Sequence, residues 1–356
     1  MSDLVLLAGA EAYRRIRQDG FSPDAVSHIA AAAGGPKWLI LDRLDRALFG
    51  EWFKARRAPI TAIGSSIGAW RLAYAAQRDP IAAIARFEVA YLEQRYSMAP
   101  GREEISAEAR RLLGVLLGDT GVAEVLAHPW LRLNVVVARC RGWLGSANAI
   151  AEKAGFLGAL LANAVSRDRL GRFVERILLH VTGGAVRLEP DAFVTHHVAL
   201  NQANLAPALL ASASVPGVMM PVRDVPGAPP GSCVDGGFVD YHMDLRLQQP
   251  EGIVFLPHFG ERVTPGWLDK FVPWRRARYL RHTLIVAPSR TFLARLPNGR
   301  IPDRRDFWRY AGDDVARVRD WKIAIAEGQR LADAFVELAA HGRFAATVQR
   351  LEPPDR

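Results

Sequence analysis

The 356-residue chain has only two cysteines, Cys140 and Cys233. A disulfide framework or a cysteine zinc site would need more, so we exclude both. A reducing compartment fits this composition best, and we expect a cytoplasmic protein. The first fourteen residues carry Asp3 and no basic residue before their apolar run, which makes them a poor secretory signal. No repeat of fixed period and no low-complexity linker divides the sequence.

Lysine is also scarce, because only five of the 46 basic residues are lysine. The net charge of +9 suggests two classes of partner, nucleic acid and anionic membrane. Residues 261–310 hold twelve basic and four acidic residues interleaved with aromatics, and they match no nucleic-acid-binding module. We expect no nucleic-acid partner. Peripheral docking on anionic lipid through Trp274, Arg275, Arg276 and Arg278 is a hypothesis, and a solvated surface with inward-packed tryptophans is its alternative.

A long stretch without charge, residues 192–222, contains no Asp, Glu, Lys or Arg and is long enough to cross a bilayer. Asn201, Gln202, Asn204 and three prolines interrupt it. These polar and helix-breaking residues argue against a transmembrane helix, so we interpret the stretch as buried core.

Short apolar runs alternate with longer amphipathic ones along the chain. We expect strands over residues 25–33, 60–63, 131–138, 176–181, 253–256 and 283–287. We expect helices over residues 37–49, 66–77 and 147–165, from Pro80, and once or twice within 313–340. Strands separated by helices predict an α/β fold with parallel pairing and helices on both faces. We place a catalytic core at residues 1–250 and an extension at 251–356 that completes or caps it.

The sequence Gly64-Ser65-Ser66-Ile67-Gly68 fits the pattern Gly-x-Ser-x-Gly between an expected strand and an expected helix. Such a turn holds the serine in a strained conformation, and the two small flanking residues let strand and helix approach closely. Ser66 is the candidate nucleophile, whereas Ser65 should point away. The alternative is a tight turn in which glycine and serine are present only because they allow the backbone to turn sharply.

A serine hydroxyl needs a neighbouring base to accept its proton. Asp235, in Val234-Asp235-Gly236-Gly237, is one candidate, although an Asp-Gly pair is also common in ordinary turns. An α/β-hydrolase triad would instead use a late histidine, and His258, His282 and His341 lie late enough. A directly acting aspartate should be partly buried, because burial raises its pKa and makes it a better base.

The sequence Ala33-Gly34-Gly35-Pro36-Lys37-Trp38 ends the first expected strand and opens a helix. Gly34 and Gly35 would offer unpaired N–H groups to the oxyanion of a tetrahedral acyl intermediate. Pro36 has no N–H, and the pattern of a phosphate-binding P-loop is absent. Two roles are open for Lys37. It contacts a lipid phosphate, or it only occupies the start of the helix without a role in binding.

Taken in this order, the three motifs resemble the patatin-like phospholipases. That family has a glycine-rich oxyanion loop after the first strand, Gly-x-Ser-x-Gly after the second, and an Asp-Gly-Gly or Asp-Gly-Ala farther on. Residues 33–38, 64–68 and 235–237 occupy those places, and residues 211–216 look like the Ala-Ser-x-x-x-Pro segment that precedes the aspartate. The similarity covers about residues 25–250.

The resemblance implies a patatin-like three-layer sandwich with a mostly parallel central sheet flanked by helices. It also implies a lipid acyl hydrolase of the phospholipase A or carboxylesterase type, with a Ser66-Asp235 dyad and no metal or organic cofactor. Ala33 and Trp38 replace glycines of the oxyanion loop. A catalytically weak lipid-binding relative is therefore an alternative, beside the α/β-hydrolase triad.

Overall fold

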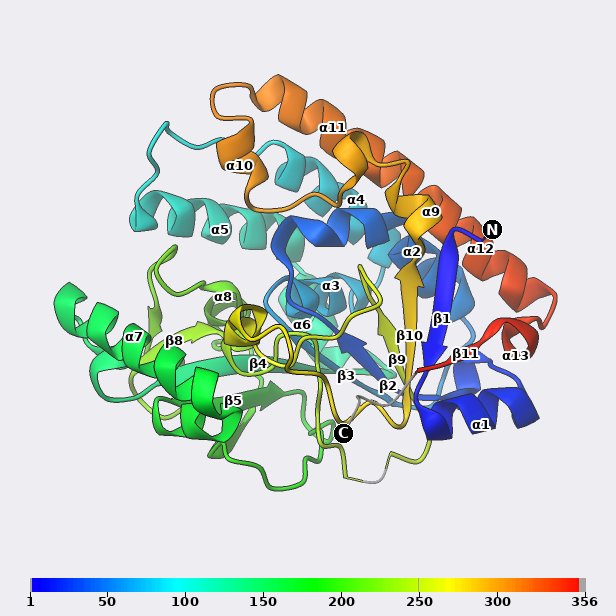
Figure 1. The fold of residues 1–356 in the computed structure, drawn as a ribbon, viewed down its shortest axis with the longest axis horizontal. Coiled ribbons are helices and arrows are strands. Elements are labelled where there is room, and N and C mark those ends of the chain that lie inside the picture. Colours follow the sequence, from blue (N-terminus) through cyan, green and yellow to red (C-terminus); the bar gives the residue numbers. More distant parts are fainter. Residues whose placement is uncertain (1, 249, 352–356) are drawn as a thin grey trace.

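The computed structural model describes residues 2–248 and 250–351, and its centre is one mixed sheet (Figure 1). In chain order the strands are β1 (Leu4–Ala8), β2 (Val26–Ala31), β3 (Ile60–Ser65), β4 (Leu131–Cys140), β5 (Val174–His180), β6 (Thr195–Ala199), β7 (Val222–Arg223), β8 (Ser232–Asp235), β9 (Ile253–Pro257), β10 (Thr283–Pro288) and β11 (Gln349–Arg350). Their spatial order is β11-β1-β10-β9-β2-β3-β4-β5-β6, and β8 pairs with β4 and β7.

The middle of the sheet is parallel, because β10, β9, β2, β3 and β4 each pair in parallel with the next. Antiparallel pairs flank it, β1 with β10 on one side and β5 with β4 on the other. All residues of β9 and β10 are buried, as expected for parallel strands that are covered on both faces. The expected central, mostly parallel sheet is confirmed.

Helices surround the sheet. They are α1 (Ala10–Asp19), α2 (Asp42–Ala47), α3 (Ile67–Ala75), α4 (Pro80–Leu92), α5 (Arg102–Leu117), α6 (Gly121–Ala127), α7 (Ala149–Val165), α8 (Leu205–Ala213), α9 (Arg290–Leu293), α10 (Asp306–Arg309), α11 (Asp314–Glu327), α12 (Gln329–Ala340) and α13 (Phe344–Thr347). One face of the sheet packs against α2, α3, α4 and α12 in the largest apolar cluster. The other face meets α7 at its β4–β5 end, and residues 243–280 cover its middle.

Local sequence signals explain several helix boundaries. Pro80 occupies the first turn of α4, where its missing N–H is not needed, and the Asp79 side chain accepts a hydrogen bond from Ala82 N–H. The closing helical region divides into α11 and α12 at Gly328. A Cβ atom there would lie 2.7 Å from the Ile40 carbonyl oxygen, so this junction packs directly on backbone.

Two expectations need correction. Residues 37–49 do not form one continuous helix, because a 3₁₀ segment, η2 (Gly35–Leu41), precedes the short α2. Gly35 has a φ of 56° and Pro36 lacks a donor, so the chain begins as a tight turn. The other correction concerns strands that are absent from the expected set, among them β1. Its apolar run is short, and it forms a strand only because β10 and β11 lie on either side.

Residues 192–222 fold as β6, α8 and β7. None of the helices in the described part of the chain combines the length and the hydrophobicity that a membrane span requires. The interpretation as buried core holds for much of α8 but is wrong for β6, where His197 and Ala199 are exposed. This strand ends the sheet, so it has a neighbour on one side only.

Candidate active site

Ser66 lies where β3 turns into α3, with a φ of 54° and a ψ of −133°. Positive φ is rare for a residue with a side chain, and it strains the backbone here. The flanking glycines permit the turn, since a Cβ atom on Gly64 would lie 2.7 Å from Ala69 N and one on Gly68 would lie 2.1 Å from the Ala31 carbonyl oxygen. The local sequence thus holds the Ser66 side chain at the edge of the sheet.

Asp235 ends β8, and the structure brings it to Ser66 across 169 positions of sequence. The Ser66 hydroxyl donates a hydrogen bond of 2.7 Å to Asp235 Oδ2. The backbone N–H of Gly237 donates to the other carboxylate oxygen, Oδ1, also at 2.7 Å. Both carboxylate oxygens are therefore held, and the carboxylate faces the serine.

The two glycines after Asp235 permit close approach. A Cβ atom on Gly236 would lie 2.0 Å from the Val136 carbonyl oxygen, and one on Gly237 would lie 2.9 Å from Asp235 Oδ1. Any side chain at these positions would displace the turn that carries the carboxylate.

Burial changes the acidity of this pair. Asp235 is 7 % exposed and Ser66 is 2 % exposed. Burial raises the pKa of the Asp235 carboxyl above its usual range, because the charged form loses hydration. The Arg304 guanidinium, the Ser66 hydroxyl and the Gly237 amide oppose that rise. The carboxylate is consequently a stronger base than a solvated aspartate.

Gly34 and Gly35 follow β2 and lie near the same edge of the sheet. Gly35 lines one cavity together with Ser66. Among the residues that the structure describes, neither backbone N–H finds a hydrogen-bond acceptor. The preceding residue, Ala33, is held by a 2.8 Å hydrogen bond from its N–H to the Tyr241 carbonyl oxygen. Two free donors thus stand on a loop whose base is fixed.

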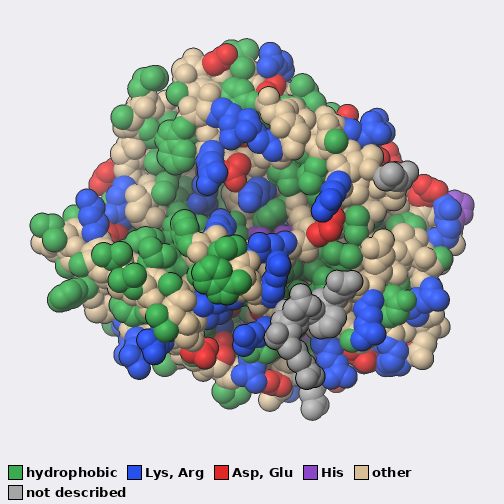
Figure 2. All heavy atoms as spheres, in the orientation of Figure 1, with side chains coloured by type: hydrophobic (Ala, Val, Ile, Leu, Met, Phe, Trp, Pro, Cys, Tyr) green, Lys and Arg blue, Asp and Glu red, His purple; other side chains and the backbone are tan. Residues whose placement is uncertain are grey.

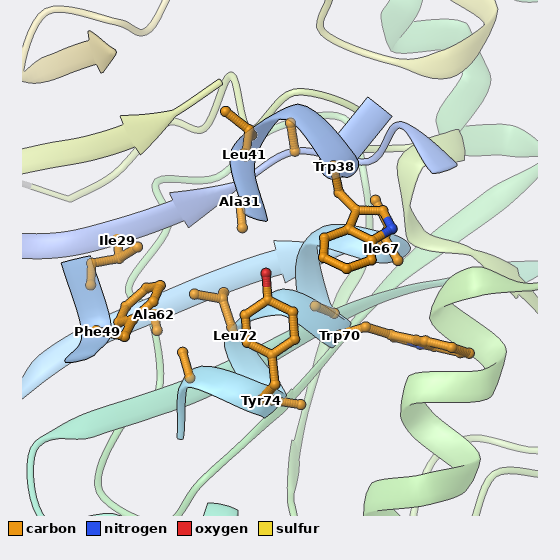
Figure 3. Packing of buried hydrophobic residues seen from close by; sticks show 14 of the residues in the cluster. Ile29, Ala31, Trp38, Leu41, Phe49, Ala62, Ile67, Trp70, Leu72 and Tyr74 are labelled. Carbon is orange, nitrogen blue, oxygen red and sulfur yellow. The ribbon is translucent and has the colours of Figure 1, made fainter. Parts of the chain in front are cut away.

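Trp38, one of the two departures from the family pattern, points away from this loop into the core. Its side chain is 1 % exposed and stacks on Phe87, with the ring centroids 5.0 Å apart. Tyr74 and Tyr91 lie at 6.1 Å and 5.5 Å. Figure 3 shows the indole among buried residues of η2 and α3. Trp38 therefore leaves the space around Ser66 free.

Lys37 lies beside the loop and is partly buried. Its Nζ atom is 3.7 Å from Asp303 and 5.0 Å from the centre of the Phe259 ring. Burial lowers the pKa of the Lys37 ammonium, and the nearby Asp303 opposes this shift.

The histidines of the alternative triad lie elsewhere. His258 is buried, contacts Gly260 through Nδ1, and lies against His242 with their ring centroids 4.4 Å apart. In residues 2–248 and 250–351, no histidine forms a hydrogen bond with Ser66 or Asp235. The structure thus joins Ser66 to a carboxylate and brings no imidazole to either residue.

A mostly apolar cavity of about 160 Å³ opens beside Ser66. Its wall comes from η2, α3, α4, α5, α8 and α10, and includes Trp70, Tyr91, Leu112, Met219 and Trp308. Such a lining suits an acyl chain.

Sequence reasoning missed one polar residue of this wall, Arg304, and a neighbouring cation, Lys270. Both lie in the basic and aromatic segment 261–310. That clustering of charge was the available signal, but the sequence left open whether it marks a membrane-docking surface or a solvated one.

The chain is similar to a known protein family. The family model described as patatin-like phospholipase matches residues 58–242, slightly more than half of the chain. The matched range contains Ser66 and Asp235, whereas Gly34 and Gly35 precede it. No curated protein matches the chain.

Proposed function

The chain belongs to the patatin-like phospholipase family, and from this premise we propose that it hydrolyses fatty acyl esters of lipids through Ser66 and Asp235. One observation carries the proposal, the 2.7 Å hydrogen bond from the Ser66 hydroxyl to a buried carboxylate. The free N–H groups of Gly34 and Gly35 and the apolar cavity support it.

In the first half of the reaction, Ser66 Oγ attacks the ester carbonyl carbon and its proton passes to Asp235 Oδ2. The carbonyl oxygen becomes an oxyanion, which the amides of Gly34 and Gly35 stabilise. The intermediate then collapses, the carbon–oxygen bond to the alcohol breaks, and Asp235 returns the proton to the leaving oxygen. An acyl-enzyme on Ser66 remains.

In the second half, water attacks the acyl carbonyl and gives a proton to Asp235. The bond to Ser66 breaks, the fatty acid leaves, and the serine oxygen recovers its proton. The buried carboxylate therefore serves as base and acid in turn, and its raised pKa favours both roles.

The direct test is hydrolysis of a short-chain nitrophenyl ester. We expect Ser66→Ala to abolish hydrolysis and Asp235→Asn to reduce it by several orders of magnitude. Ser65→Ala is the matched control, because the Ser65 hydroxyl donates to the Asp240 carbonyl oxygen and not to the dyad. A fluorophosphonate probe should label the native protein and not Ser66→Ala. Unchanged hydrolysis in Ser66→Ala would show that the proposal is wrong, and absence of labelling would favour the lipid-binding relative.

We also propose peripheral contact with anionic bilayers, chiefly through a surface on α7 and not through residues 274–278. Of the four residues expected there, Arg275 donates to Asp269 at 2.6 Å and is therefore already paired, whereas Trp274, Arg276 and Arg278 are exposed. The larger apolar surface lies on α7, where Figure 2 shows hydrophobic side chains at the left of the view. Four side chains on this surface are 55 % to 80 % exposed: Ile150, Leu157, Leu161 and Val165.

Charge favours a bilayer as the occupant of the α7 surface. The single acidic residue of α7, Glu152, is paired with Arg102. Exposed residues in and just after the helix include three basic ones, Lys153, Arg169 and Arg172, against one acidic one, Asp168. Arg102 also donates to the carbonyl oxygen of Met219, a residue of the cavity wall. The apolar surface therefore adjoins the cavity, so a docked bilayer would bring its lipids close to Ser66.

Vesicle co-sedimentation tests the contact. We expect binding that increases with anionic lipid and is lost in Leu157→Ser/Leu161→Ser, while hydrolysis of a soluble ester is retained. Val315→Ser is the control, because Val315 is an exposed apolar residue of α11. Binding that ignores lipid charge, or a dimer in gel filtration that the double variant dissociates, would contradict docking on a bilayer.

A further inference from the structure

Two basic side chains beside the dyad, Arg304 and Lys270, donate no hydrogen bond to any residue that the structure describes. Arg304 lines the cavity with Ser66 and lies 4.0 Å from Asp235 Oδ2. Its guanidinium makes no hydrogen bond in the part of the chain that the structure describes. It therefore keeps five N–H donors for another group.

Lys270, at the end of η7 (Trp267–Phe271), is the other such residue. Its Nζ atom lies 4.0 Å from the centre of the Tyr241 ring and forms no ion pair with any described residue. A ring face attracts a cation without using its three N–H donors in ordinary hydrogen bonds. The charge also reaches the dyad, since Lys270 lowers the pKa of Asp235.

Contacts place these two side chains and Lys37 around the dyad. A Cβ atom on Gly35, two residues before Lys37, would lie 2.9 Å from Arg304 Nε, and Lys270 lies on the ring of Tyr241, whose Cδ2 atom would be 3.1 Å from a Cβ atom on Gly237. The charges of Lys37 and Arg304 lower the pKa of Lys270, and that of Arg304 lowers the pKa of Lys37. Among the described residues, Asp303 and Asp235 oppose this concentration of positive charge, and Asp235 already accepts hydrogen bonds from Ser66 and Gly237. Figure 2 shows a hollow on this side of the molecule with Lys and Arg side chains around it.

Three cations beside two acids are costly unless a further anion binds among them. We propose that Lys270, Arg304 and Lys37 form a subsite for an acidic group, a phosphate or carboxylate, on the same molecule whose ester Ser66 attacks. This inference rests on the proposed function, and it specifies the substrate as an ester whose negative charge lies near the scissile bond. Neutral acylglycerols would lack the group that the subsite binds.

A pair of soluble esters isolates this effect. Dibutyryl phosphatidic acid and dibutyrylglycerol differ by one phosphate, and release of butyrate measures both reactions. We expect kcat/KM of the native protein to be at least about tenfold higher for the acidic ester than for the neutral one. Hydrogen bonds between charged groups are stronger than those between neutral groups. Inorganic phosphate should compete with dibutyrylglycerol if the subsite also accepts free phosphate, and should not compete if it needs the whole lipid.

Lys270→Gln is the diagnostic variant. It should remove most of the preference, because KM for the acidic ester should rise far more than KM for dibutyrylglycerol. Lys270→Arg should restore the preference. Lys322→Gln, which removes an exposed lysine on α11, is the charge-matched control. Equal kcat/KM for the two esters in the native protein, or an equal loss for both esters in Lys270→Gln, would overturn the subsite.

Calorimetry separates this proposal from the hydrolase assignment. Ser66→Ala should bind dibutyryl phosphatidic acid more tightly than dibutyrylglycerol, and adding Lys270→Gln should remove the difference. Binding with this pattern in a protein that never hydrolyses either ester would keep the subsite and reject the hydrolase. Hydrolysis without any such difference in binding would keep the hydrolase assignment and reject the subsite.

Discussion

The Arg304 guanidinium lies 4.0 Å from Asp235 Oδ2, the same oxygen that accepts the hydrogen bond from the Ser66 hydroxyl. Burial and Arg304 thus act on one carboxylate in opposite directions, and burial is the larger effect on its pKa. The balance leaves Asp235 basic enough to accept a proton while a neighbouring charge limits how far its pKa rises.

Arg304→Gln should therefore move the pH profile. Removing the positive charge raises the pKa of Asp235 further, so the carboxylate becomes protonated at a higher pH. We expect the acidic limb of kcat/KM for a neutral ester to shift toward higher pH, with little change at the alkaline plateau. Arg300→Gln, at an exposed position in the same segment, should leave the profile unchanged. A profile unaffected by Arg304→Gln would show that the two charges do not interact.

The contrast between Asp235 and Arg304 shows what the sequence could predict. Ser66 and Asp235 stand in turns whose glycines are required locally, so motifs identify both residues even though 169 positions separate them. Arg304 stands in no motif, and only the packing of residues 261–310 against the core brings it to the cavity. Composition showed that charge gathers in this segment, but it could not show which face the charge covers.

The same distinction applies to the fold. The strands of the parallel centre are apolar enough to be recognised singly, and the structure confirms them at β2, β3, β4, β9 and β10. β1 could not be recognised, because a short apolar run near the start of the chain becomes a strand only through its neighbours β10 and β11. The broken start of α2 likewise depends on Gly35, whose positive φ no periodicity reveals.

A further prediction concerns pH and Lys270, whose pKa is lowered to about 7, mainly by burial and then by Lys37 and Arg304. Asp303 and Asp235 act in the opposite direction, and the rings of Tyr241 and Trp267 face the ammonium. Below about pH 7 the side chain is charged, and above it neutral. KM for dibutyryl phosphatidic acid should therefore rise as pH increases through about 7.

The comparison for this pH effect is Lys270→Arg, which stays charged throughout and should remove the rise in KM. KM for dibutyrylglycerol should be flat over the same range in both proteins. If the native protein and Lys270→Arg gave the same KM profile for the acidic ester, Lys270 would not be the titrating group.

Gly35→Ala tests the oxyanion loop. Gly35 has a φ of 56°, and a Cβ atom there would lie 2.9 Å from Arg304 Nε. Alanine keeps the backbone N–H, but strain at this φ and the contact with Arg304 should turn that N–H away from the oxyanion. We therefore expect kcat to fall by up to about 100-fold to 1000-fold, the usual cost of losing an oxyanion donor. Gly183→Ala is the matched control, because Gly183 also has a positive φ, 74°, but a Cβ atom there would meet nothing within 4 Å.

The two alanine variants carry a similar backbone strain. A difference in kcat between them therefore measures the effect of the oxyanion loop on catalysis and not the effect of strain. Circular dichroism and fluorophosphonate labelling should confirm that both remain folded. Equal and small effects of the two substitutions on kcat would mean that the Gly35 amide does not stabilise the oxyanion.

The final prediction concerns Trp38. It stands where the family pattern has a glycine, so its side chain could be expected to disturb the oxyanion loop. Because the indole is buried among Tyr74, Phe87 and Tyr91, Trp38→Ala should reduce the free energy of unfolding by about 3–5 kcal/mol. Trp38→Phe keeps an aromatic ring in the same space and should cost less. Urea unfolding measures both changes. The fraction that remains folded should retain the native kcat, since the side chain points away from Ser66; an increased kcat in Trp38→Ala at unchanged stability would instead show that the indole obstructs the oxyanion loop.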